Sequence, residues 1–257
     1  MAPSQHTAHP LVFLHGWTMR GAIFDDLIAR MGPGARCFAP DMPGHGSAAD
    51  QPLSLVAMAD AVADLLARND LQKVILVGWS MGAAAAWQMI QRHGTARLAG
   101  LVTVDMSPRL VSGPDWPHGL KGQSPADVQA STRRMAEDWP GMAHAIAATM
   151  FAQPGGAPGF SSDAAFAQIM ANDPDLMRQI WDELVAMDLR RVIPDLDVPY
   201  LVTYGQRSRV YPASAAQWLA ETAPQGRVQG FAQSGHSPHL EEPAAFADCL
   251  KRFAAGL

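Results

Sequence analysis

The 257-residue sequence has few cysteines, no excess of basic charge and no long apolar run. Its two cysteines, Cys37 and Cys249, lie far apart without metal-ligand or redox spacing, which predicts reduced thiols. A net charge of -5 leaves no basic surface for phosphates, so nucleic acid is not an expected partner. No stretch is long enough to span a membrane, and the first ten residues lack a secretory signal. We therefore expect a cytoplasmic protein with no membrane partner.

Short apolar runs alternate with segments whose apolar residues recur on one helical face. Hydrophobic residues make up 48% of the chain, enough for a sizeable core. The strand-like runs are 11–14, 36–39, 74–77, 101–104, 200–204 and 227–231. The helical segments between the first three runs are 22–30 and 56–66. This alternation predicts an α/β fold, with a mostly parallel sheet of about six strands flanked by helices.

The strand predicted at 74–77 ends in a Gly-x-Ser-x-Gly pentapeptide at residues 78–82. This pentapeptide is typical of a tight strand-to-helix turn that presents a serine, and its small flanking residues prevent clashes. The alanine-rich segment 83–90 favours the helix that must follow. Free N–H groups at the start of that helix can stabilise negative charge beside Ser80. Ser80 is therefore the predicted nucleophile; the alternative is an ordinary serine in a turn of small residues.

A serine nucleophile needs an adjacent base, and His236 is the candidate. It follows the last predicted strand in a loop from which its side chain can reach back over the sheet. His239 is its competitor, because a His-x-x-His pair beside Glu241 and Glu242 could indicate a metal site. No third ligand occurs at a familiar spacing, so neither a metal nor a cofactor is expected. Pro243 is better interpreted as the start of the final helix, with both carboxylates at its positive end.

Four motifs occur in one order: 15–17 (His-Gly-Trp), 41–46, 78–82 and 234–243. Together they resemble the α/β-hydrolase superfamily, and within it small bacterial carboxylesterases of the pimeloyl-[acyl-carrier protein] methyl ester esterase type. The resemblance covers roughly residues 10–107 and 196–257. It implies a catalytic triad in the order serine, acid, histidine, and an oxyanion hole formed by the backbone N–H groups of Trp17 and Met81.

The acid departs from the pattern of this family, which usually carries it a few residues after the seventh strand, as Gly-x-x-Asp. Here that segment is Gly205 to Ser208, and serine cannot hold a charge. Asp105 is the carboxylate at the end of the predicted core strand next to the nucleophile strand. Because neighbouring strands lie about 5 Å apart, its side chain can reach an imidazole above Ser80. We predict that Asp105 orients His236; the alternative is that it caps the Ser107-Pro108 turn.

Domain organisation follows from the same comparison: a hydrolase core at 1–106 and 196–257, and a helical cap at 107–195, inserted after the sixth family strand. Within 107–195, the sequence predicts helices over 126–137, 142–151 and 174–187, the last with Asp173 as N-cap and Pro174 at its first position. A Pro/Gly hinge is predicted at 153–159. Large apolar side chains are expected to line the substrate pocket: Trp79, Trp116, Trp139, Met142, Met150 and Trp181. The alternative is that most of them form the core of the cap itself.

The predicted function is hydrolysis of a carboxylic ester with a small or medium apolar acyl group, through an acyl-enzyme intermediate at Ser80. The same groups could instead serve a carbon-carbon bond hydrolase, a thioesterase, a lactonase or a lyase. A lapsed enzyme that acts as a small-molecule receptor is a further alternative. An acyl carrier protein is a possible partner but not the favoured one, because residues 107–195 hold more acidic than basic side chains. The sequence leaves the oligomeric state open.

Overall fold

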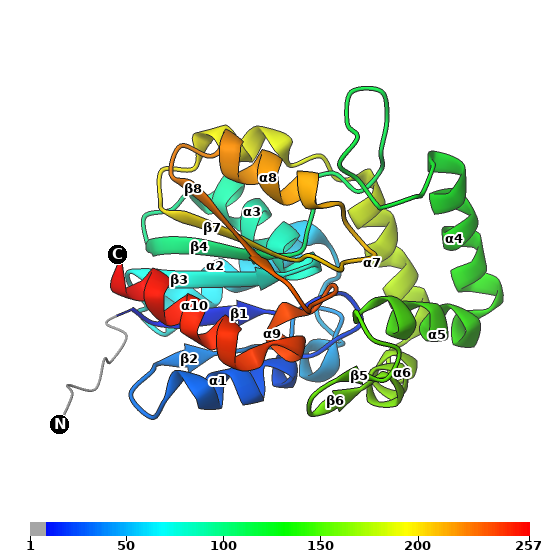
Figure 1. The fold of residues 1–257 in the computed structure, drawn as a ribbon, viewed down its shortest axis with the longest axis horizontal. Coiled ribbons are helices and arrows are strands. Elements are labelled where there is room, and N and C mark those ends of the chain that lie inside the picture. The colour runs from blue at the N-terminus through cyan, green and yellow to red at the C-terminus, as the bar shows by residue number, and fades with distance from the viewer. Residues whose placement is uncertain (1–8) are drawn as a thin grey trace.

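A six-stranded parallel sheet forms the centre of the molecule, which a computed structural model describes over residues 9–257 (Figure 1). The strand order is β2-β1-β3-β4-β7-β8, and every neighbouring pair is parallel. The strands are β1 (Leu11–Leu14), β2 (Cys37–Phe38), β3 (Val74–Trp79), β4 (Leu98–Val104), β7 (Tyr200–Gly205) and β8 (Gly226–Phe231). The predicted α/β fold with about six parallel strands is confirmed.

Helices cover both faces of this sheet, which explains why its central strands are continuous apolar runs. In β3 every residue is buried. Residues of α1 and α10 pack in one hydrophobic cluster, and residues of α2, α3 and α8 pack in another. These helices are α1 (Asp25–Met31), α2 (Leu55–Arg68), α3 (Met81–His93), α8 (Ala213–Thr222) and α10 (Pro243–Ala255), with the short α9 (Pro238–Glu241) before the last. Three 3-10 turns, η1 (Gly21–Phe24), η2 (Gly46–Ala48) and η3 (Arg190–Asp195), complete the layers.

The segment between β4 and β7 carries four helices, which Figure 1 shows grouped beyond one end of the sheet. They are α4 (Pro125–Glu137), α5 (Trp139–Thr149), α6 (Ser162–Met170) and α7 (Pro174–Ala186). The predicted N-cap of α7 is confirmed, since the Asp173 side chain accepts from two backbone N–H groups of its first turn. A short hairpin of β5 (Gly156–Ala157) and β6 (Phe160–Ser161) occupies part of the predicted hinge.

Some elements differ from the sequence prediction. The helix predicted over 22–30 is a 3-10 turn followed by α1. Strand β4 starts at Leu98 rather than Leu101, because Leu98 and Gly100 pair with β3. Position 100 shows no strand signal because a side chain there would collide with the ring of Phe253. Helix α6 was not predicted, although Ser161 caps it by accepting from the Ala164 N–H. The start of β4 depends on neighbouring residues in the fold, and α6 depends on a capping serine; neither is visible in the pattern of apolar residues.

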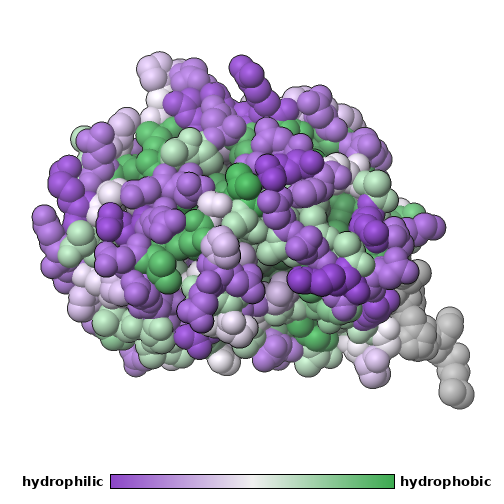
Figure 2. All heavy atoms as spheres, turned by 180° about the vertical axis from the view of Figure 1, so that it is seen from behind, coloured by the Kyte–Doolittle hydropathy of each residue, from purple (hydrophilic) through white to green (hydrophobic). Residues whose placement is uncertain are grey.

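Hydrophilic side chains cover most of the face turned away in Figure 1, with hydrophobic residues interspersed (Figure 2). The large hydrophobic residues that are exposed lie apart from one another in the chain: Val56, Met170, Val228 and Leu257. Among residues 9–257, no helix has the length and apolar character needed to cross a bilayer.

Candidate active site

The turn between β3 and α3 holds Ser80 in an unusual backbone conformation, with φ 52° and ψ -120°. The turn is tight because glycines flank the serine. A Cβ on Gly78 would lie 2.5 Å from the Gly82 carbonyl oxygen, and one on Gly82 would lie 2.1 Å from that of Leu14. The Ser80 N–H donates to the Val104 carbonyl at 3.0 Å, which ties the turn to the end of β4. The pentapeptide therefore presents Ser80 at the carboxyl end of the central strands, beside Asp105.

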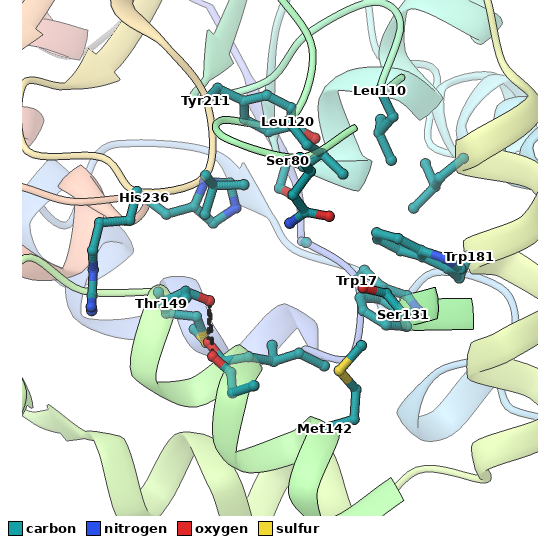
Figure 3. Close-up of a pocket in the computed structure, with 18 of the residues that line it drawn as sticks. Trp17, Ser80, Leu110, Leu120, Ser131, Met142, Thr149, Trp181, Tyr211 and His236 are labelled. Carbon is teal, nitrogen blue, oxygen red and sulfur yellow. Dashed lines mark hydrogen bonds between the residues drawn. The ribbon is translucent and has the colours of Figure 1, made fainter. Parts of the chain in front are cut away.

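The side chains of Asp105 and His236 are joined by a short hydrogen bond of 2.6 Å between Oδ2 and Nδ1. An ionised carboxylate can only accept, so Nδ1 carries the proton and Nε2 presents a lone pair. The pair is buried, with Asp105 4% and His236 6% exposed. In Figure 3 the His236 imidazole points towards Ser80, and His236 and Ser80 line the same cavity. Within residues 9–257 the Ser80 hydroxyl has no hydrogen-bond partner. Hydrogen bonds between a nucleophile and its base are often long in unliganded structures and tighten when substrate binds.

Glu241 holds the loop that carries His236. One carboxylate oxygen accepts from the backbone N–H groups on either side of the histidine, those of Gly235 at 2.7 Å and Ser237 at 3.3 Å. The other oxygen accepts from the Ala152 N–H at 2.6 Å, which joins the loop to the segment between β4 and β7. Burial raises the pKa of Glu241, although these donors act in the opposite direction. The loop thus has little freedom to displace the imidazole.

Glu242 has a similar role. Pro243 begins α10 and Glu242 precedes it, as predicted, but the carboxylate of Glu242 binds donors of the preceding loop rather than the first turn of the helix. This carboxylate accepts from the Gln233 N–H and from the Ser234 hydroxyl, at 2.9 and 2.6 Å. No side chain caps α10. The physical reason is that the loop preceding α9 brings several unpaired donors close to these carboxylates.

Two buried histidines shape the loop at residues 16–18. His15 Nε2 accepts from the Met42 N–H at 2.9 Å, and His45 Nε2 accepts from the Thr18 N–H at 3.3 Å. Acting as acceptors requires neutral rings, and burial lowers the pKa of His15 to about 3 and that of His45 to about 4. Both side chains are fully buried. They are structural groups that fix the backbone beside Trp17.

The amide groups predicted to bind an oxyanion are free of intramolecular partners. Across the described chain, the backbone N–H groups of Trp17 and Met81 donate to no other group. Met81 is the first residue of α3, so its N–H belongs to the unpaired first turn of that helix. The Trp17 indole donates to the Met177 carbonyl at 3.0 Å, which fixes the loop from the other side.

Acid should destabilise the fold through its buried histidines. Burial also lowers the pKa of His239 to about 3, so His15, His45 and His239 all titrate well below their ordinary value of 6.5. Between those values the unfolded chain binds protons that the folded chain does not, so their stabilisation is complete above pH 6.5 and is lost as pH falls. Each contributes about 1.4 kcal/mol per pH unit in that interval, and the raised pKa of Glu241 acts in the opposite direction. We expect urea unfolding to give a slope on the order of 3 kcal/mol per pH unit near pH 5.

His239→Phe is the control for this pH dependence. Both ring nitrogens of His239 are buried without a partner in the described chain, and the ring packs against Trp79 and Phe24. Phenylalanine fits these contacts and cannot be protonated, so the slope should fall by about 1.4 kcal/mol per pH unit. A free energy of unfolding that stays constant from pH 7 to pH 5 would contradict the prediction.

A cavity of about 490 Å³ opens beside Ser80 and His236 (Figure 3). The predicted residues Trp79, Met142, Met150 and Trp181 line it. Large apolar side chains that the sequence did not single out also line it, among them Met106, Leu110, Leu120, Met135, Ile146 and Leu184. The polar side chains in the lining are Gln123, Asp127, Ser131, Arg134, Thr149 and Arg209. The cavity therefore suits a largely apolar group near Ser80.

The structure places Trp116 and Trp139 outside this lining, which corrects their prediction as pocket residues. Trp116 donates from its indole to the Arg109 carbonyl at 2.9 Å and packs edge-on against Trp218, with ring centres 4.8 Å apart. Trp139 is 7% exposed and lies behind Trp17, 6.4 Å away between ring centres. Both serve packing, because large aromatic side chains in this segment also have to form its own core.

The sequence analysis did not predict that Ser208 and Tyr211 contact the residues of the site. The Ser208 hydroxyl donates to Asp105 Oδ2 at 2.7 Å. The Tyr211 ring lies 6.0 Å from the His236 ring and lines the cavity. Burial, and then the charge of Asp105, raise the pKa of Tyr211 above its ordinary value, so it stays a neutral phenol. No local pattern marks either residue, because both contacts join loops that are distant in sequence.

Comparisons with known proteins identify the family of this chain. Residues 11–249 match the family described as Alpha/beta hydrolase family. The chain is 31% identical over 251 residues to the pimeloyl-[acyl-carrier protein] methyl ester esterase of Vibrio vulnificus, covering 95% of this chain and 93% of that protein. It is also 31% identical over 267 residues to the esterase of the same name from Xanthomonas oryzae pv. oryzae, with 96% and 95% covered.

Solved structures show the same fold. The esterase EaEST from Exiguobacterium antarcticum superposes with a TM-score of 0.89 at 24% identity, covering 96% of this chain and 92% of that one. The esterase RhEst1 from Rhodococcus sp. ECU1013 gives a TM-score of 0.82 at 25% identity, with 98% and 92% covered.

Proposed function

This chain belongs to the alpha/beta hydrolase family and is a hydrolase that acts on esters, and from that premise we propose that it works through a serine triad. In the proposed triad Ser80 is the nucleophile, His236 the general base and Asp105 the acid. The observation that carries the proposal is the 2.6 Å bond between Asp105 and His236, in a cavity that Ser80 also lines. Such a constellation is identified by geometry rather than by sequence position.

Acylation begins when the Ser80 oxygen attacks the ester carbonyl carbon and its proton passes to His236 Nε2. Asp105 stabilises the positive imidazole through Nδ1–H. The carbonyl oxygen becomes an oxyanion, which the N–H groups of Trp17 and Met81 bind. The C–O bond of the ester then breaks, and His236 returns the proton to the leaving alcohol oxygen. The acyl group is left on Ser80.

Deacylation repeats these steps with water as the nucleophile. His236 Nε2 removes a proton from water, the hydroxide oxygen attacks the acyl carbon, and the same N–H groups bind the second oxyanion. The bond to the Ser80 oxygen breaks, the serine regains its proton from His236, and the carboxylic acid leaves. No cofactor enters this scheme.

Residues 107–195 are the proposed cap of this enzyme, and residues 1–106 and 196–257 its core. The lining supports this division, because α4, α5 and α7 contribute side chains on the side of the cavity away from Ser80. Two contacts from the segment reach the loop at residues 16–18: the Trp17 indole donates to Met177, and Asn172 donates to the Thr18 carbonyl at 2.9 Å. The cap thus selects the acyl group and supports the oxyanion loop.

Hydrolysis of a nitrophenyl ester series from acetyl to dodecanoyl tests this function. The expected optimum is an acyl chain of small or medium length, because the cavity of about 490 Å³ is largely apolar but bounded by polar side chains. Met142→Trp should move the optimum to shorter chains by filling the lining. Equal rates across all chain lengths, or no activity with any ester, would count against an apolar acyl substrate; inactivity would favour a carbon-carbon hydrolase, a lyase or a receptor.

A second candidate substrate is a methyl ester on a carrier-bound acyl chain, as in the names of the Vibrio and Xanthomonas relatives. The observation that favours it is that two exposed arginines, Arg134 and Arg209, line the cavity and could meet an anionic carrier. Against it, Arg134 already pairs with Asp138 at 3.2 Å. A carrier-bound methyl ester should then react faster than the free one, with a preference that declines as salt rises. Equal rates at low salt would exclude this candidate.

A further inference from the structure

Ser208 lies three residues past the end of β7, in contact with the acid of the proposed triad. Its Oγ is 2.7 Å from Asp105 Oδ2, the same oxygen that receives the His236 Nδ1–H at 2.6 Å. Ser208 is 3% exposed, so water does not compete freely for its hydroxyl. Two donors therefore converge on one carboxylate oxygen.

The direction of the hydrogen bond follows from the surroundings of the hydroxyl. A serine hydroxyl has one hydrogen and two lone pairs. The backbone N–H groups of Val210 and Tyr211 approach the Ser208 Oγ at 3.2 and 3.4 Å, and an N–H can only donate. Both acceptor positions are thus occupied, and the hydrogen is directed at Asp105. The loop after β7 fixes the hydroxyl as a donor.

Both partners are held by the rigid part of the fold. The Ser208 N–H donates to the Gly205 carbonyl at 3.0 Å, and Lys121 donates to the Ser208 carbonyl at 3.2 Å. Asp105 has a left-handed backbone, with φ 45°, and its N–H donates to the Thr203 carbonyl at 2.8 Å. The backbones of β4 and β7 are hydrogen-bonded neighbours. The hydroxyl and the carboxylate are therefore placed independently of substrate.

We propose that Ser208 is a positioning residue: it fixes the orientation of the Asp105 carboxylate, and through it the imidazole of His236. This inference rests on the proposed triad. A carboxylate held by a single hydrogen bond can rotate about its Cβ–Cγ bond, whereas a second donor on the same oxygen removes that freedom. Ser208 thereby completes an acid that β4 supplies and β7 orients.

Ser208→Ala should lower kcat for a nitrophenyl ester roughly 10- to 100-fold, the range for a lost hydrogen bond to a charged group. KM should change little, because Ser208 is absent from the cavity lining. In proton NMR, the deshielded Nδ1–H resonance of His236 should shift or broaden. Ser208→Cys, which keeps the volume but donates weakly, should fall between wild type and Ser208→Ala. The cysteine variant carries the test if the alanine variant does not fold.

Ser107→Ala is the matched control. Ser107 is equally buried and lies two residues from Asp105, but its hydroxyl donates to the Arg109 carbonyl at 2.8 Å and not to the carboxylate. Its kcat and Nδ1–H resonance should match wild type. In an Asp105→Asn background, Ser208→Ala should cost less than about twofold, because a residue that acts through Asp105 has nothing left to position. A full additional loss there, or an unchanged kcat and resonance in the single variant, would overturn the proposal.

The resonance separates this inference from the proposed function. If wild type hydrolyses no ester, the serine mechanism fails, yet the effect of Ser208→Ala on the Nδ1–H signal still reports whether Ser208 orients Asp105. If wild type is active through Ser80 and the Nδ1–H resonance of His236 is unchanged in Ser208→Ala, the proposed function stands and only the positioning role of Ser208 is disproved.

Discussion

Ser80→Ala is expected to lower kcat for nitrophenyl esters by a factor on the order of a million, the cost of removing a serine nucleophile from a complete triad. The oxygen that would form the acyl bond is lost, while the cavity and the oxyanion donors remain. Residual hydrolysis should come from binding and oxyanion stabilisation alone. A fluorophosphonate should add one adduct to wild type by intact mass, and none to the variant.

The fold should survive this change, since alanine meets the same backbone requirement as serine at φ 52°. Ser214→Ala is the control: this serine lies on α8, bonds to His118 at 2.9 Å, and is absent from the cavity lining. It should retain wild-type turnover and labelling. Substantial turnover in Ser80→Ala would mean that another group attacks the ester, and a wild type that neither turns over esters nor takes the label would favour a lapsed enzyme.

Asp105→Asn should reduce kcat by about 10⁴-fold, the scale found when a triad acid becomes its amide. Asparagine is nearly the same size, so the geometry is preserved, but it holds no charge to stabilise a protonated His236. Its NH₂ group can also donate to Nδ1, which favours the tautomer with the proton on Nε2, where the lone pair is needed. The measurement is kcat over pH 6 to 9, together with the unfolding midpoint of each variant.

Asp115→Asn is the matched control, because Asp115 is an exposed carboxylate whose partners are Arg109 and Arg190. It should leave kcat unchanged. Most of the turnover surviving in Asp105→Asn would show that the carboxylate serves the turn rather than the base. The contacts argue otherwise, since the hydroxyl of Ser107 satisfies that turn while the Asp105 carboxylate bonds to His236 and Ser208.

The sequence was most informative where local geometry is demanding. The pentapeptide around Ser80 requires glycine at 78 and 82 because the backbone of α3 approaches β1 and β3. That requirement can be recognised directly in the sequence as a Gly-x-Ser-x-Gly motif. Apolar runs likewise predicted the parallel strands, since strands buried on both faces must be apolar throughout. The start of β4 escaped prediction because Ala99 and Gly100 carry no strand signal of their own, and Leu98 and Gly100 pair only because β3 lies beside them.

The lining of the cavity shows what the sequence could not predict. Large side chains in 107–195 predicted an apolar cavity correctly in kind, yet Trp116 turns to Trp218 while Leu110 and Leu120 face Ser80. Composition cannot distinguish a side chain that lines a cavity from one that packs behind it. Only the tertiary packing of this segment decides which side chains reach the cavity.

By itself, the sequence determined the fold class, the turn that presents Ser80 and the residue types of the site, because these depend on short-range sterics and on hydrophobic period. It predicted Asp105 as the acid from its charge and from its position at the end of the strand next to the nucleophile strand. Tertiary structure decided how the acid is held: residues 105, 208 and 236 come from separate segments, and their hydroxyl, carboxylate and imidazole meet only when β4 and β7 lie side by side. Hydrogen bonds act over about 3 Å, and no pattern along the chain encodes distances that the packing of the sheet creates.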